Sequence, residues 1–235
     1  MPLPTLLILP GLLEDADAFE ALIAGTQDIA ASFAADMTRA DSIAGLAAEA
    51  LKQAPDGPFM LAGHSMGGYV ALEIVRQAPE RVTRLALLNT NARPDSAEST
   101  ENRRRLMALA ERDFEGVINA LMPKVLSASH QKDPVMTGMV AAMAHGVGKE
   151  AFKRQQQAII GRVDSRPHLG AIRCPTCVVA AREDAIMPVE ILEEMAKGIP
   201  GARLEIVEDS GHMASIEQPE EVVRILRDWI QGGSP

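Results

Sequence analysis

A serine at position 65 has the surroundings of a reactive nucleophile. It lies in the run Gly63-His64-Ser65-Met66-Gly67, with a glycine two positions to either side. The missing Cβ atoms of these glycines allow the chain to bend sharply, and a serine at such a bend can be aimed at a substrate. A serine hydroxyl becomes a strong nucleophile when a base takes its proton, and the base needs a third group to hold its tautomer. The run therefore points to Ser65 as a candidate nucleophile.

The residues around Ser65 predict a strand before it and a helix after it. Phe59 to Gly63 is an apolar run of strand length, and the apolar residues beyond the turn recur with a helical period. They are Val70, Leu72, Ile74 and Val75. The first N–H groups of that helix can bind an anion. The alternative is a glycine-rich turn in which the serine is incidental.

A Gly-x-Ser-x-Gly run between a strand and a helix resembles the nucleophile elbow of the α/β-hydrolase fold family. The resemblance implies a serine hydrolase with a helical cap, in the branch of the esterases and lactonases. It also implies that an acid and then a base follow the nucleophile along the chain, and that two backbone N–H groups bind the oxyanion.

The base implied by the resemblance is His212. It follows the predicted strand 203–207 and an acidic turn, and Gly211 gives it the Gly-His context of the family's catalytic histidine. The alternative is a loop histidine exposed to solvent. His64 is next to Ser65 in the chain, but neighbours in a tight turn point in different directions. We therefore expect His64 to be packed or hydrogen bonded beside the site.

The acid implied by the resemblance is Asp184. Residues 181–184 end a predicted strand with Ala-x-x-Asp, where the family usually has Gly-x-x-Asp. Glu183 is the competitor, and we interpret it as a solvated loop charge. Some family members carry the acid after the preceding strand, which would nominate Asn91 or Asp95. An asparagine cannot stabilise an imidazolium by charge.

The resemblance assigns the oxyanion hole to the backbone N–H groups of Leu12 and Met66. Met66 follows the nucleophile at the helix N-terminus. Leu12 lies in the loop after the first predicted strand, where the family commonly has His-Gly-x and this chain has Pro10-Gly11-Leu12. Without that histidine, we expect Pro10 itself to stiffen the loop.

Apolar side chains are expected to line the substrate pocket. The helical middle of the chain is rich in methionine, which is typical of a core at helical spacing but also of an adaptable binding surface. The run Arg103-Arg104-Arg105 has the charge to bind a substrate carboxylate, but three consecutive helical residues point in different directions, so we expect most of them to be solvated. The predicted pocket residues are Leu13, Met122, Met139, Met143 and Met213.

Strand and helix patterns alternate along most of the chain, which predicts an α/β fold with a mostly or wholly parallel sheet of about six strands flanked by helices. The predicted strands are 5–9, 27–33, 59–63, 82–88, 176–181 and 203–207, and other predicted helices include 17–24. From 91 to 168 only helices are predicted, among them 98–112, 114–122, 133–145 and 149–160. The resemblance to the hydrolase family implies that 1–90 and 169–235 form the hydrolase core, with 91–168 as a helical cap inserted after the fourth strand.

Composition argues against several classes of partner. The chain has 23 basic and 32 acidic residues and a net charge of -9, which disfavours binding to nucleic acid or to an anionic membrane. The apolar N-terminus lacks a basic flank, and no segment reaches the length needed to cross a bilayer. We expect a cytoplasmic monomer or homodimer whose partner is a small ester-like substrate.

The only cysteines, Cys174 and Cys177, have the spacing of a redox or zinc motif. Zinc would need two further ligands, and a thioredoxin-like motif should open a helix, whereas this one runs into a predicted strand. We interpret both as structural and expect no metal or cofactor.

The sequence thus predicts a carboxylesterase-like serine hydrolase that cleaves a small ester, lactone or thioester through an acyl-serine. The same residues would also serve a C–C bond hydrolase or a cofactor-free perhydrolase. A non-catalytic ligand receptor on this scaffold is a further alternative, although the presence of all three catalytic residue types argues against it.

Overall fold

Residues 2–232 are described by the computed structural model, and within them six strands form one sheet. The strands are β1 (Thr5–Leu9), β2 (Ala31–Ala34), β3 (Phe59–His64), β4 (Val82–Leu88), β5 (Thr176–Ala181) and β6 (Arg203–Val207). They lie in the order β2-β1-β3-β4-β5-β6, and every neighbouring pair is parallel. This confirms the predicted parallel sheet, and it brings the carboxyl ends of all the strands to one edge.

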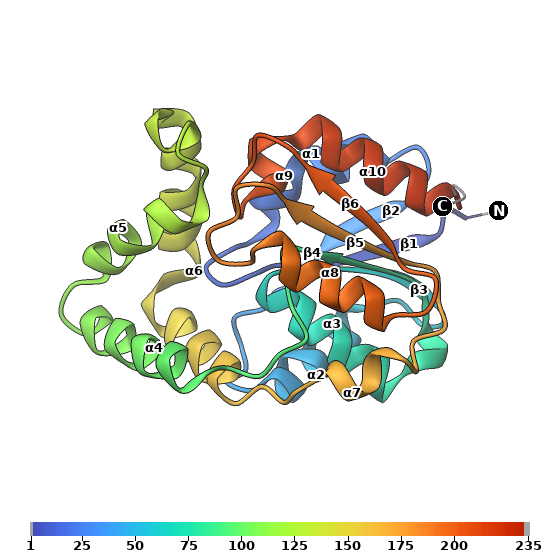
Figure 1. Cartoon of the computed structure of the whole chain (residues 1–235), viewed down its shortest axis with the longest axis horizontal. Helices are drawn as coiled ribbons and strands as arrows, with labels where there is room; N and C mark the ends of the chain where they lie inside the picture. Colours follow the sequence, from blue (N-terminus) through green and yellow to red (C-terminus); the bar gives the residue numbers. More distant parts are fainter. Residues whose placement is uncertain (1, 233–235) are drawn as a thin grey trace.

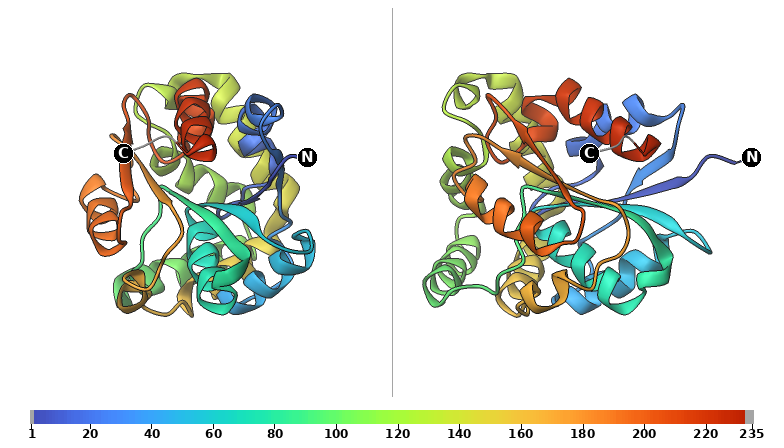
Figure 2. Two further views of the ribbon diagram at one scale, coloured as in Figure 1. Left: turned by 90° about the vertical axis from the view of Figure 1, so that its right-hand side faces the viewer. Right: turned by 45° about the vertical axis from the view of Figure 1, so that its right-hand side comes forward.

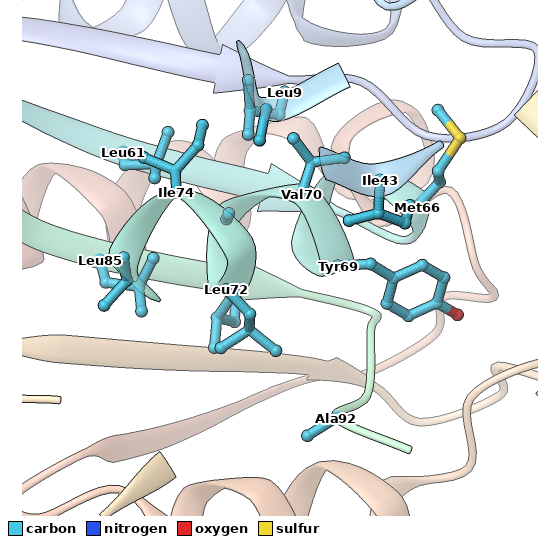
Figure 3. Close-up of a cluster of buried hydrophobic side chains, with 14 of the residues drawn as sticks. Leu9, Ile43, Leu61, Met66, Tyr69, Val70, Leu72, Ile74, Leu85 and Ala92 are labelled. Atoms are coloured by element: carbon cyan, nitrogen blue, oxygen red, sulfur yellow. The ribbon is translucent and has the colours of Figure 1, made fainter. Parts of the chain in front are cut away.

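Helices cover both faces of the sheet (Figure 1). One layer contains α1 (Glu20–Thr26), α9 (Ala214–Glu217) and α10 (Pro219–Gln231), and the other contains α2 (Ile43–Gln53), α3 (Met66–Gln77) and α8 (Val189–Gly198). Successive side chains of a strand point to opposite faces, so Leu6 and Leu7 of β1 belong to different hydrophobic cores. In the core under α3, Ile74 lies beside Leu61 of β3 (Figure 3). Burial on both faces explains why β1, β3 and β5 are nearly continuous apolar runs.

Between β4 and β5 the chain forms helices instead of strands. These are α4 (Ala97–Ala110), α5 (Phe114–Val125), α6 (Pro134–Ile160) and the short α7 (Arg166–Leu169). The first three stand beyond the carboxyl edge of the sheet, toward which the strand arrows point (Figure 1, Figure 2). The division of the chain into a core at 1–90 and 169–235 and a cap at 91–168 stays a prediction.

Helix α6 contains a break that the sequence predicted as a gap between two helices. The predicted helices 133–145 and 149–160 are joined into one element, but Gly148 inside it has φ 79° and ψ 166°. A positive φ is readily adopted only by glycine. The two helices therefore meet at Gly148 with no loop between them.

Two predicted elements near the N-terminus differ from the structure. The strand expected at 27–33 is β2 at Ala31–Ala34, because residues 27–29 form a turn after α1. The helix expected at 17–24 begins as a 3-10 helix, Ala16–Phe19, before α1. Its cap is Asp15, whose carboxylate accepts a hydrogen bond from the N–H of Asp17 at 3.0 Å.

One cysteine, Cys177, lies in β5, and the other, Cys174, lies just before it. Both cysteines are free thiols, and burial raises the pKa of the Cys177 thiol in β5 to about 11. Nowhere in residues 2–232 do three or more His, Cys, Asp or Glu side chains gather as a metal site would need. None of the helices described here is both long and apolar enough to cross a bilayer.

Two glycines let α3 approach the sheet at its N-terminal end. A Cβ atom on Gly67 would lie 1.9 Å from the carbonyl oxygen of Leu9, and one on Gly63 would lie 2.4 Å from the carbonyl oxygen of Gly67. Both contacts are with backbone, which cannot move away as a side chain can. The first turn of α3 is therefore pressed against the ends of β1 and β3.

Replacing Gly67 by alanine is expected to destabilise the fold by about 2 kcal/mol or more, because the new Cβ would overlap the Leu9 carbonyl. Gly138→Ala is the matched control. An added Cβ there meets nothing within 4 Å, and alanine is favoured over glycine inside a helix by up to about 1 kcal/mol. Urea unfolding should move the two midpoints in opposite directions, and an unchanged midpoint for Gly67→Ala would contradict the packing argument.

Candidate active site

Ser65 lies between β3 and α3 in a backbone conformation that is rare for a residue with a side chain. Its φ is 50° and its ψ is -115°. Such a conformation costs about 1–3 kcal/mol and persists only where the surroundings impose it. Here the Ser65 N–H donates to the Leu88 carbonyl at 3.0 Å, and the Thr90 hydroxyl donates to the Ser65 carbonyl at 2.7 Å. The serine side chain is thereby fixed at the carboxyl edge of the sheet.

Ser65, His212 and Asp184 form a continuous hydrogen-bonded chain. Nε2 of His212 is 2.8 Å from Oγ of Ser65, and Nδ1 of His212 is 2.7 Å from Oδ2 of Asp184. A carboxylate only accepts, so Nδ1 carries a proton and the neutral ring presents Nε2 as an acceptor for the serine hydroxyl. The three residues predicted from the sequence are thus brought together in an arrangement suited to proton transfer from the serine.

The carboxylate of Asp184 is buried and fully hydrogen bonded. Its Oδ1 accepts from the N–H groups of Ile186 and Met187 at 2.8 and 2.9 Å, and its Oδ2 accepts from the Asn89 amide at 2.9 Å. Burial alone would raise the pKa of Asp184, but the charge and hydrogen bond of His212, with the other donors, hold this pKa below its ordinary value. Asp184 is therefore ionised at neutral pH.

The other candidates for the acid are engaged elsewhere. Glu183 is exposed to solvent. The carboxylate of Asp95 is bound by Arg162 at 2.7 Å and by Arg103 at 3.2 Å. The side chain of Asn91 accepts a hydrogen bond from the N–H of Arg93 at 2.8 Å.

A second buried histidine, His64, joins two loops of the site. Its Nδ1 is 2.8 Å from Oε2 of Glu14, and its Nε2 is 2.8 Å from the carbonyl oxygen of His212. Burial would lower the pKa of His64, but the charge and hydrogen bond of Glu14 and the His212 carbonyl outweigh it, so this pKa lies above its ordinary value. Both ring nitrogens face acceptors, which fits an imidazolium paired with Glu14. His64 is a hydrogen-bonded neighbour of the site, as expected.

The loop after β1 holds the first of the two predicted oxyanion donors. The N–H of Leu12 donates to no group within residues 2–232, and Met66 is the first residue of α3, whose N–H has no acceptor inside the helix. The loop is held by Glu14, whose Oε2 accepts from Gly11 N–H at 2.7 Å, and by Gln155, whose Oε1 accepts from Leu13 N–H at 3.1 Å. Side-chain hydrogen bonds thus hold this loop, and stiffening by Pro10 itself stays a prediction.

A cavity of about 400 Å³ opens onto Ser65 and His212. Its apolar wall includes Leu13, Leu106, Ile118, Met122, Val140, Met143, Ile159 and Met213. Four of the five predicted pocket residues are in this set, and Met139 is the exception. Met139 is 36% exposed, because Met136, Val140 and Met143 form the inward stripe of α6 at helical spacing and Met139 falls at its edge.

The cavity also has a polar side that the sequence did not reveal. Tyr69, Ser99, Asn102, Arg103, Lys124 and Gln156 line it. The arginine run was expected to be mostly solvated, and this holds for Arg104 and Arg105. The side chain of Arg103 is only 19% exposed and lies in the cavity wall.

The amino-acid sequence is similar to those of known proteins. A family model described as alpha/beta hydrolase fold matches residues 36–219. RutD of Klebsiella pneumoniae, whose name proposes a carbamate hydrolase, is 28% identical over 199 residues, which are 83% of this chain and 74% of that protein. A pimeloyl-acyl-carrier-protein methyl ester esterase of Aromatoleum aromaticum is 26% identical over 205 residues, or 77% of each chain. The chain spans 65% of the RutD protein of Variovorax paradoxus.

The fold is also shared with solved structures. A thermophilic esterase from Thermogutta terrifontis, solved with malate bound, matches 100% of this chain and 92% of its own with a TM-score of 0.89 and 27% identity. The family model covers more than half of the chain, and the six-stranded parallel sheet of the described residues has the corresponding architecture. The chain therefore belongs to the alpha/beta hydrolase fold family and is a hydrolase of that fold.

Proposed function

We propose that this hydrolase cleaves small carboxylic esters, lactones or thioesters through an acyl intermediate on Ser65. The observation that carries the proposal is the chain from Ser65 Oγ through His212 to the ionised Asp184, at 2.8 and 2.7 Å, on the wall of a cavity. Two of the compared proteins are named as esterases and one as a carbamate hydrolase. Hydrolysis of an ester or of a carbamate breaks a bond between a carbonyl carbon and an oxygen or nitrogen atom.

In the first half of the reaction, His212 Nε2 takes the Ser65 proton as the serine oxygen attacks the carbonyl carbon. The N–H groups of Leu12 and Met66 bind the oxyanion of the tetrahedral intermediate. The imidazolium of His212 faces Asp184, which stabilises its charge. His212 then protonates the leaving oxygen or sulfur, the bond to the carbonyl carbon breaks, and the acyl group stays on Ser65.

In the second half, water replaces the departed alcohol or thiol. His212 takes a proton from that water, whose oxygen attacks the acyl carbon, and the same N–H groups bind the second oxyanion. The bond to Ser65 breaks and the serine oxygen takes the proton back from His212. The products are the free acid and the original enzyme.

We infer that residues 91–168 act as a cap over a core formed by 1–90 and 169–235. Leu106 of α4, Ile118 of α5 and Met143 of α6 supply one wall of the cavity, and Leu13 and Met213 of the core supply another. Enclosure by apolar side chains excludes water, which strengthens the electrostatic interactions of the site. A volume of about 400 Å³ suits a small-molecule substrate.

A fluorophosphonate should add to the chain once, on Ser65, because among the hydroxyls that line the described cavity this one is hydrogen bonded to a histidine. Ser65→Ala should remove both the adduct, measured by intact mass, and nearly all ester hydrolysis, a loss on the order of 10⁴-fold or more. Ser99→Ala, which changes another cavity hydroxyl, is the control and should keep the adduct. An adduct that persists in Ser65→Ala would assign the nucleophile elsewhere.

Asp184→Asn should lower kcat by roughly 10³- to 10⁴-fold, since an amide can neither hold the His212 tautomer nor oppose the imidazolium charge. Glu183→Gln, the neighbouring exposed carboxylate, should change kcat by less than about twofold. Steady-state hydrolysis of a p-nitrophenyl ester measures both. Equal losses would show that the acid is misassigned.

Glu14 acts as a positioning residue, because it binds both the oxyanion loop at Gly11 and the ring of His64. Glu14→Gln should lower kcat by about 10- to 100-fold with little change in KM, since the oxyanion is bound mainly in the transition state. Glu20→Gln, an exposed carboxylate of α1, is the control and should leave both constants unchanged. An effect of Glu14→Gln on KM alone would contradict this role.

A further inference from the structure

The polar side of the cavity carries a positive charge that the chain itself does not neutralise. Arg103 of α4 donates through Nε to Asp95 at 3.2 Å and through Nη1 to Oε1 of Gln156 at 2.9 Å. Asp95 also binds Arg162 at 2.7 Å, so one buried carboxylate is shared by two guanidinium groups. The two guanidinium groups and the one carboxylate therefore leave a single net positive charge at the cavity wall.

Gln156 supplies a buried donor that has no acceptor. Its side chain is wholly buried in α6. A guanidinium only donates, so Gln156 must turn its oxygen toward Arg103, and this orientation leaves its Nε2 pointing away from Arg103. That nitrogen has no hydrogen-bond partner within the described residues. A buried donor without a partner is uncommon in folded proteins, and this one lies in a cavity wall.

The rest of the cavity offers no negative charge to pair with this cluster. Within the part of the chain that the structure describes, Glu14 is the one acidic residue of the cavity lining, and it is already bound to His64 and Gly11. Lys124 adds a second cation to the lining. An anionic group on a ligand would therefore be attracted into the cavity and would find Arg103 and Gln156 as donors.

We propose that Arg103 and Gln156 form a carboxylate subsite, and that the substrate is a small ester or lactone that carries a free carboxylate. The inference deepens the proposed function and rests on it. A carboxylate has two oxygens and matches the planar fork of a guanidinium, so one oxygen can accept from Arg103 while the other accepts from Gln156 Nε2. The Nη2 group of Arg103 makes no hydrogen bond to residues 2–232 and is available for this contact. The carboxylate would orient the reacting carbonyl within the cavity that also contains Ser65.

The test compares two esters that differ in charge and little in shape. The p-nitrophenyl monoester of glutaric acid carries a carboxylate, and p-nitrophenyl 5-methylhexanoate carries an isopropyl group in its place. We expect kcat/KM to favour the charged ester in the unaltered enzyme, and Arg103→Met to lower the charged-to-neutral ratio by about 10- to 100-fold. Gln156→Met should lower the same ratio by about 3- to 10-fold. Arg104→Met, an exposed neighbour, is the control and should leave both rates unchanged.

Calorimetric binding of glutarate tests the subsite without turnover. Glutarate should bind the unaltered protein and Ser65→Ala alike, and Arg103→Met should weaken this binding by at least about tenfold. If glutarate does not bind, or binds Arg103→Met as well as the unaltered protein, the subsite is overturned. A charged-to-neutral ratio unchanged by Arg103→Met and Gln156→Met overturns it also. Glutarate binding that depends on Arg103, in a protein that hydrolyses neither ester, would support the subsite and contradict the proposed function.

Discussion

The strained backbone at Ser65 is the constraint on which the rest of the site depends. A positive φ at a serine is unfavourable, so it survives only because β3, β4 and α3 fix the residue from three sides. The glycines at 63 and 67 let the helix press against the strands, and the parallel sheet brings the loops after β5 and β6 to the same edge. The serine then meets a histidine and an aspartate that are 147 and 119 residues away in the chain.

Around this turn, buried ionisable side chains are arranged as two linked pairs. His212 is bound to Asp184, and His64 is bound to Glu14 and to the backbone of His212. The two rings lie 4.9 Å apart, so the pair that holds the loop at Gly11 is in contact with the pair that is hydrogen bonded to Ser65. Buried polar networks whose members are all hydrogen bonded are rigid as a rule, so loss of one pair would disturb the loop and His212 together.

The sequence predicted those strands and site residues that are marked by a short local motif or by an apolar run. Apolar runs located most of the strands, and the Gly-x-Ser-x-Gly turn and the Gly-His pair pointed to Ser65 and His212 through a family resemblance. Glu14 could not be found in this way, since a single glutamate in a loop has no periodicity, and its role depends on contact with His64 across the fold. Arg103 was hidden among three arginines, and only the packing of α4 against α6 distinguishes it. Tertiary contacts between distant segments decide such positions.

The central claim is that the acyl group passes through the serine of the turn. Rapid quenching during hydrolysis of a p-nitrophenyl ester, followed by tryptic digestion, tests it most directly by mass spectrometry of the peptide spanning residues 53–76. The peptide should gain the mass of the acyl group within the first turnover and lose it as substrate is exhausted. Rapid hydrolysis with no acylated form of that peptide at any time would contradict the account.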